Sequence, residues 1–133
     1  MRFFSKVKDG GSKSPVDGYF LFELKSVCSV VLLKFNQGGR EAFHTHAFNA
    51  YTWFICGSLR EEKYDGSYYD YVKSVLPKYT PRDNNHRVAA IKDSWCLSLR
   101  GPWCDTWTEN TETEKVTLTH GRKVLFTINQ QKE

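Results

Sequence analysis

The sequence lacks long apolar runs. Its apolar stretches are short, as at Val30–Leu33, whereas a helix that crosses a bilayer needs about 20 apolar residues. Residues 1–15 start with basic character but contain no apolar core of the kind that a secretory signal requires. These absences argue against a membrane-spanning or secreted protein, and we expect a soluble protein of the cytoplasm.

Helical periodicity and cysteine motifs are also missing. No extended segment keeps apolar residues at helical spacing, and no internal repeat is present. The cysteines form no C-x-x-C pair, which argues against a zinc ribbon or a redox dithiol. We expect free, mostly buried thiols, with a reactive role open only for Cys104, beside Trp103 and Asp105. The four cysteines are Cys28, Cys56, Cys96 and Cys104.

Charge of one sign does not gather in blocks. The chain has 19 basic and 15 acidic residues, a formal net charge of +4, and the basic residues are scattered. Such a surface is typical of soluble proteins and gives no evidence of a nucleic-acid groove. The positive balance could help to attract an anionic substrate or nucleic acid, and the expected partner is a small-molecule ligand or substrate rather than nucleic acid.

Aromatic residues are abundant, with 9 Phe, 7 Tyr and 4 Trp among 133 residues. Flat aromatic rings suit pleated sheet surfaces, so the composition favours an all-β protein. The length fits one domain, residues 1–133. Within it, residues 1–17 are rich in glycine and serine, and we expect this N-terminal segment to be loosely structured.

Short apolar runs separated by turn signals predict an antiparallel β-barrel of at least eight strands. Turns are expected at Gly57–Ser58, Asp65–Gly66 and Asp93–Ser94, and a loop at residues 74–85. Residues 103–109 give no clear signal. Strands are expected at 19–25, 27–35, 41–48, 51–56, 59–64, 68–72, 86–92 and 95–100, with a final hairpin of 111–118 and 123–129 around His120–Gly121.

His44 and His46 stand two residues apart in an apolar, aromatic stretch. In a strand, residues i and i+2 point to the same face, so the two imidazoles would converge. Neutral imidazoles bind divalent transition metals well. The pair therefore indicates a metal site, although a single histidine is more often a hydrogen-bonded core or surface residue.

The spacing around these histidines resembles the first motif of the cupin superfamily. Gly38 precedes His44 by six positions, and Gly57 follows His46 after ten intervening residues. The usual glutamate of the motif is missing, because Ala50 and Tyr51 stand where it is expected. The resemblance implies a cupin-type jelly roll, also called a double-stranded β-helix.

Pro81 and His86 resemble the second cupin motif. Asp83 stands where glycine is usual, and Ala90 where asparagine is usual. The combined resemblance implies a divalent metal ion held by three histidines, His44, His46 and His86. Such a set resembles the 3-His iron cupins of the thiol dioxygenase kind, so Fe(II) is the first candidate, with Zn, Ni or Mn as alternatives.

A nearer likeness, from about Pro15 to Leu125, is to small uncharacterised cupin-like proteins of phage and bacterial genomes. It is carried by His86-Arg87, Trp95 and the segment Arg100-Gly101-Pro102-Trp103. That likeness implies little about function. It is compatible with a phage-like accessory protein that binds a ligand without catalysis.

Several further residues are candidates for the site. Arg100 and Arg87 are the predicted catalytic residues, because a guanidinium can grip a carboxylate or phosphate with two hydrogen bonds. Glu61 and Asp83 are the carboxylates that could join the histidines. Tyr51 and Trp53 could line the pocket, although a core role is favoured for both. His120 lies in a predicted turn and is expected at the surface.

Three classes of function follow from these residues. One is a non-haem iron dioxygenase, a metal-dependent oxidoreductase that acts on a small molecule. Another is an isomerase or epimerase with a histidine as general base, which would need a carboxylate to orient that histidine. The third is a non-catalytic cupin that binds a small ligand, a nucleotide or a partner protein. The aromatic-rich strands Tyr19–Leu24 and Val30–Phe35 further predict a homodimer.

Overall fold

The computed structural model describes residues 1–40 and 42–130. Among these, regular structure is almost entirely antiparallel β-strand, with one 3-10 turn, η1 (His120–Arg122). The prediction of an all-β protein with more strand than helix is confirmed. The strands are β1 (Arg2–Lys8), β2 (Val16–Leu24), β3 (Cys28–Phe35), β4 (Gly38–Gly39), β5 (Phe43–His44), β6 (Ala50–Lys63), β7 (Tyr68–Tyr71), β8 (Lys78–Thr80), β9 (His86–Arg100), β10 (Trp107–Asn110), β11 (Glu114–Thr119) and β12 (Lys123–Asn129).

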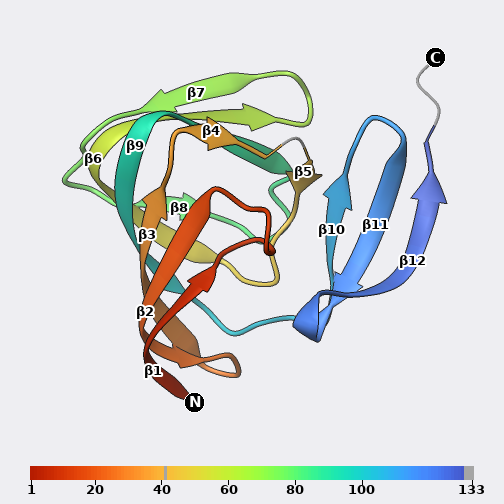
Figure 1. The fold of residues 1–133 in the computed structure, drawn as a ribbon, viewed down its shortest axis with the longest axis horizontal. Helices are drawn as coiled ribbons and strands as arrows, with labels where there is room; N and C mark the ends of the chain where they lie inside the picture. The colour runs from red at the N-terminus through yellow and green to blue at the C-terminus, as the bar shows by residue number, and fades with distance from the viewer. Residues whose placement is uncertain (41, 131–133) are drawn as a thin grey trace.

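The described strands form one 12-stranded sheet that curves around the interior (Figure 1). Its main order is β1-β2-β3-β9-β5-β10-β11-β12, and β6 pairs along β9 while also carrying β7 and β8. In Figure 1 the blue strands β10, β11 and β12 stand to the right of the others. The short strand β5 joins the two groups, because it pairs with β9 on one side and with β10 on the other.

Two predicted turns lie inside long strands instead. Gly57–Ser58 falls within β6 and Asp93–Ser94 within β9, and the register between these strands shifts at this point. Gly57 has a φ of +103°, and a Cβ added there would lie 2.1 Å from Oγ of Ser94. A bulge bends a strand without ending it. The residues predicted to form turns therefore form bends within β6 and β9.

The N-terminal segment 1–17 is more ordered than expected. β1 pairs with β2 from Arg2↔Glu23 to Lys8↔Asp17, so only residues 9–15 of this segment lie between strands, and we call them the N-terminal turn. The strand expected at 41–48 is short: β5 covers Phe43–His44, and Glu41 lies outside the described residues. The loop expected at 74–85 contains β8.

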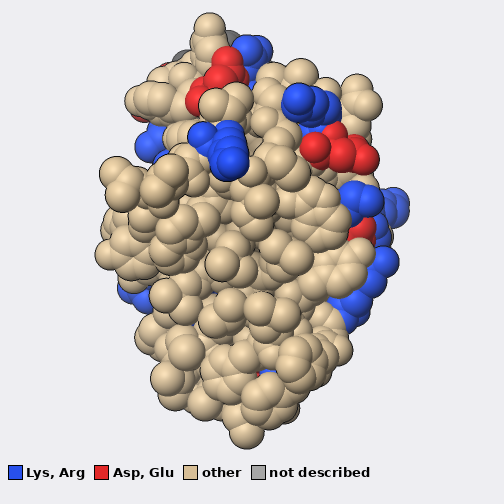
Figure 2. All heavy atoms as spheres, turned by 90° about the vertical axis from the view of Figure 1, so that its left-hand side faces the viewer, with Lys and Arg blue, Asp and Glu red and all other residues tan. Residues whose placement is uncertain are grey.

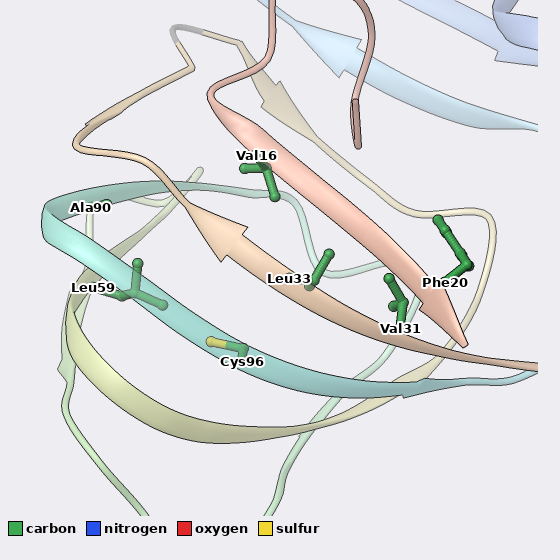
Figure 3. Packing of buried hydrophobic residues seen from close by; sticks show 7 residues of the cluster. All are labelled: Val16, Phe20, Val31, Leu33, Leu59, Ala90 and Cys96. Atoms are coloured by element: carbon green, nitrogen blue, oxygen red, sulfur yellow. The ribbon is translucent and has the colours of Figure 1, made fainter. Parts of the chain in front are cut away.

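The main buried cluster lies between β2, β3, β6 and β9, whose apolar side chains point into the interior (Figure 3). A second cluster joins the start of β6 to β10 and β11. Burial raises the pKa of the Cys96 thiol to about 12, and all four cysteines are free, although Cys56 is exposed rather than buried. The main cluster is Val16, Phe20, Val31, Leu33, Leu59, Ala90 and Cys96, and the second is Ala47, Phe48, Ala50, Trp107 and Leu118.

The alternation along β9 separates the interior from the outer surface. Cys96, Ser98 and Arg100 are buried and line an internal cavity. The apolar residues between them therefore face outward, where β6 and β9 form an outer face with few charges (Figure 2). We define this outer face by its exposed apolar side chains, which are Tyr51, Ile55, Ile91 and Leu99. No helix among the described residues is long and apolar enough to span a membrane.

Candidate metal centre

His44, His46 and His86 come together from two separate stretches of chain. His44 ends β5 and His86 begins β9, and the two residues are paired in register. His46 follows β5, and its backbone N–H donates to the carbonyl of Arg82 at 2.9 Å. The ring centroids lie 4.8 Å apart for His44 and His46, 5.0 Å for His44 and His86, and 4.9 Å for His46 and His86. The structure thus gathers the three histidines that the spacing singled out.

The three rings direct nitrogen atoms toward a common point. Nε2 of His46 and Nε2 of His86 are 3.4 Å apart, and one ligand nitrogen of each histidine lies within 4.8 Å of the others. In a tetrahedral site with metal–nitrogen bonds of about 2.0–2.1 Å, ligand nitrogens lie about 3.4 Å apart. The imidazole donor set therefore suits a divalent transition metal, and the separation between His46 and His86 matches this spacing.

The histidines line a cavity of about 390 Å³, a size common for small-molecule sites. Its walls are mainly apolar and aromatic, with contributions from both buried clusters. Seven lysine and arginine side chains line it, against four aspartate and glutamate side chains. The cavity therefore favours an anionic occupant.

A buried carboxylate holds His86 from the side away from the other two histidines. Oε2 of Glu61 accepts a hydrogen bond from Nδ1 of His86, which leaves Nε2 directed toward His46. Glu61 is 2% exposed. Its Oε1 accepts from Nζ of Lys78 at 2.5 Å, and its Oε2 accepts from Nδ2 of Asn84 at 3.3 Å. A carboxylate in this position fixes the tautomer and the orientation of a ligating histidine.

Burial and neighbouring charges set the protonation states. Burial, followed by the charges of His86 and Arg40, lowers the pKa of His44 from 6.5 to about 3. Burial likewise holds the pKa of His46 well below 6.5. Burial alone would raise the pKa of Glu61, but hydrogen bonds from His86 and Lys78 outweigh it, so that pKa is lowered. These shifts keep His44 and His46 neutral and Glu61 ionised near neutral pH, the forms that suit metal binding.

Comparison with known proteins rests on structure. No protein-family model matches the sequence, and no curated protein matches it. An RmlC-like cupin from Shewanella frigidimarina NCIMB 400 superposes with a TM-score of 0.57 over 74% of this chain and 84% of that chain, at 16% identity. The chain has the cupin fold.

Two further solved structures extend this likeness. One is a sugar phosphate isomerase of the cupin superfamily from Silicibacter pomeroyi DSS-3, with a TM-score of 0.57, 15% identity, and coverage of 89% of this chain and 77% of that one. The other is KdgF from Halomonas sp., with a TM-score of 0.57, 18% identity, and coverage of 77% and 96%. Identities this low show a shared fold, which hosts many activities. The prediction of a cupin-type fold is confirmed, whereas the likeness to 3-His iron cupins stays a prediction.

Arg100 also lies in the cavity, at the end of β9. It is 4% exposed, and its Nη1 and Nη2 donate to Oδ1 and Oδ2 of Asp9 at 3.2 and 2.8 Å. Its guanidinium carbon is 4.5 Å from the ring centroid of Phe48, and that ring is 5.5 Å from the ring of His46. One aromatic ring thus separates Arg100 from the histidines.

Arg87 is not brought to the histidines. It follows His86 directly in β9, so its side chain points to the opposite face of the strand. Its Nε and Nη2 donate to Oε2 of Glu62 at 3.1 and 2.8 Å, and it does not line the cavity. The two predicted catalytic arginines therefore lie on different sides of the sheet.

The other candidates from the sequence also divide between the interior and the outer surface. Glu61 faces the interior and orients a histidine, whereas Asp83 lies in an exposed turn. Tyr51 and Trp53 are on the outer side of β6, where Tyr51 packs on Tyr79 at 5.1 Å, so neither lines the cavity. The remaining candidate, His120, is in η1 with its side chain 46% exposed, as expected for a surface residue.

Sequence reasoning missed a set of charged residues at the cavity. Asp9 belongs to the N-terminal turn, which gave no signal beyond its glycines. Arg40 and Arg122 both donate to Oε1 of Glu109, with the Arg122 bond at 2.6 Å. These contacts join residues far apart in the chain, so only the strand pairing could reveal them.

Proposed function

We propose that this cupin binds one divalent metal ion through His44, His46 and His86 and acts on a small anionic molecule in the adjoining cavity. Fe(II) is the first candidate ion, which would make the protein a dioxygenase-like, metal-dependent oxidoreductase. The convergence of the three imidazoles, with ligand nitrogens within 4.8 Å of one another, carries the proposal.

The chain's own residues have distinct roles in this proposal. Glu61 keeps the proton of His86 on Nδ1, so that the Nε2 lone pair faces the site. Lys78 keeps Glu61 ionised. Arg100 positions an anionic group of the substrate, and the aromatic wall around it excludes water. When bound, the ion would supply the Lewis-acid or one-electron chemistry that these side chains lack.

A second candidate function is that of a cupin isomerase or epimerase. It is favoured by the Glu61–His86 hydrogen bond, because a carboxylate at Nδ1 strengthens Nε2 as a general base. In the sequence, the first cupin motif lacks its usual carboxylate, and Glu61 was one of two candidates outside that motif. One structural neighbour is described as a sugar phosphate isomerase, which fits this alternative. A non-catalytic binding protein is the third outcome to be tested.

Oxygen uptake and hydrogen exchange separate these functions. Metal-free and Fe(II)-loaded protein would be incubated in D2O with a panel of small carboxylates and sugar phosphates. Oxygen consumption by the Fe(II)-loaded protein alone supports the proposal. Carbon–hydrogen exchange that survives metal removal and is lost in Glu61→Gln contradicts it and supports the isomerase. Ligand binding without either reaction contradicts both enzymatic functions.

A further inference from the structure

The carboxylate of Asp9 contacts the guanidinium of Arg100 as the carboxylate of a bound ligand would. Both of its oxygens accept from Arg100, at 3.2 and 2.8 Å. Asp9 belongs to no strand, and its side chain is 31% exposed, whereas that of Arg100 is 4% exposed. The partner of this buried guanidinium therefore comes from a turn rather than from the barrel wall.

The N-terminal turn lies against the cationic side of the cavity. Gly10 and Gly11 have φ values of +102° and +101°, and a Cβ at Gly10 would lie 2.7 Å from Nη1 of Arg40. A Cβ at Gly11 would lie 3.2 Å from Nε of Arg122. The glycines thus let the backbone approach two further guanidiniums that line the same cavity as Arg100.

A buried guanidinium needs an anionic partner, because leaving it unpaired is strongly unfavourable. Nε of Arg100 is buried and has no hydrogen-bond partner among the described residues. Asp9 therefore satisfies the charge of Arg100 but not all of its donors. A free ligand that brought its own carboxylate could take the same place.

We propose that Arg100 binds the carboxylate of a small organic acid and that Asp9 competes with this ligand for the same guanidinium. The ligand carboxylate replaces that of Asp9, which moves to solvent with the N-terminal turn, while the rest of the ligand lies along Phe48 toward the histidines. A carboxylate is favoured over a phosphate because a planar, singly charged carboxylate already fits here. This inference depends on the proposed function only for the reaction at the metal site. Binding of the carboxylate to Arg100 needs no metal.

Asp9→Asn tests the competition directly. Benzoate and inorganic phosphate would be titrated calorimetrically into metal-free protein at constant ionic strength. We expect Asp9→Asn to bind benzoate about tenfold more tightly than wild type, with a smaller gain for phosphate. Asp70→Asn is the matched control, because Asp70 accepts two bonds from Arg60 at 2.8 and 3.1 Å on the exposed surface. It should leave benzoate affinity unchanged.

Gly10→Ala provides a second variant that keeps every charge. An alanine at a φ of +102° strains the backbone of the turn, so the turn should loosen and benzoate affinity should rise, even if Asp9→Asn fails to fold. The double variant Asp9→Asn/Arg100→Gln should lose the gain. Folded Asp9→Asn and Gly10→Ala proteins with wild-type affinity would overturn the inference. So would a gain that survives in the double variant, or an equal gain for phosphate.

Because every titration uses metal-free protein, the outcome is independent of the metal site. A protein that never retains metal but shows the Asp9→Asn gain would contradict the proposed function and support this inference. A protein that binds metal but shows no gain in benzoate affinity in Asp9→Asn would support the proposed function and contradict this inference.

Discussion

Glu61 is the residue whose contribution to the site is most easily isolated. Replacing it with glutamine removes the charge behind His86 and leaves a side chain of the same size. Metal affinity should fall about 10–100-fold, the usual effect of losing such a partner of a ligating histidine. Competition with a chromogenic chelator measures the change. Glu62→Gln is the control, because Glu62 is adjacent in β6 but pairs outward with Arg87. Equal affinities in the two variants would contradict the role of Glu61.

Buried histidines should make the metal-free protein sensitive to acid. The pKa of His44 is about 3 in the folded state, against about 6.5 in an unfolded chain. Between these values the unfolded state binds a proton that the folded state does not, so stability falls as pH falls. From pH 7 to pH 5, His44 alone should account for a loss of about 2 kcal/mol.

Urea unfolding of metal-free protein at the two pH values checks this expectation. His44→Gln should lose about 2 kcal/mol less than wild type between pH 7 and pH 5. His120→Gln should lose as much as wild type, because His120 is half-exposed. The same pH dependence in His44→Gln and wild type would show that His44 is not held neutral.

The sequence could predict the three histidines because their spacing is local or follows a known motif. Strand alternation could also have separated Arg87 from His86, since neighbouring residues in a strand face opposite sides. It could not relate Arg100 to His86, because a turn was expected at Asp93–Ser94, where the structure has one continuous strand, β9. The sequence could not predict that Glu61 contacts His86, because this depends on the register of β6 against β9. The contact of Asp9 with Arg100 could not be predicted either, because it joins residues far apart in the chain.

At the scale of elements, Gly57 is required for the close contact between β6 and β9. A Cβ at this position would lie 2.1 Å from Oγ and 2.5 Å from Cα of Ser94, at a φ of +103°. Gly57→Ala should therefore destabilise the protein by about 3 kcal/mol or more, since both strain and backbone displacement are involved.

Gly66→Ala is the matched control for Gly57. Gly66 also has a positive φ, +95°, but a Cβ there would meet nothing within 4 Å. Its cost should be limited to the strained backbone, about 1 kcal/mol. Urea unfolding compares the two variants, and equal losses would show that the contact with Ser94 is unimportant.

Most strands were predictable because aromatic and β-branched residues alternate between turn signals. The ends of the strands were less predictable. Glycine and aspartate signals mark a bend equally well when it lies inside a strand, as in β6 and β9, and only long-range pairing decides the outcome. β1 was missed because its pairing with β2 supplies the order that its own sequence does not suggest.

At the scale of the molecule, the outer face remains unpaired within one chain. Leu99 and Ile55 are 39% and 44% exposed there, and few charges interrupt the surface (Figure 2). β2 and β3, the strands that suggested a homodimer, belong to the same curved sheet. We propose that two copies associate through this outer face, because an apolar surface with few charges is compatible with its own copy.

Sedimentation velocity tests this homodimer. Wild type should sediment as a dimer at tens of micromolar, and Leu99→Lys should shift it toward monomer, since a charge would be buried without a partner. Val124→Lys is the control, because Val124 is exposed on β12, on the opposite side in Figure 1. A wild-type monomer, or equal behaviour of the two variants, would reject this interface.

The metal content of the purified protein is the most direct test of the account. Plasma emission spectroscopy would be applied to wild type and to the alanine variants of His44, His46, His86 and His120. About one ion per chain is predicted for wild type and His120→Ala, and little metal for the other three variants, which should stay folded because none of the three histidines belongs to either buried cluster. Equal metal in His86→Ala and wild type would remove His86 from the site and contradict the three-histidine centre.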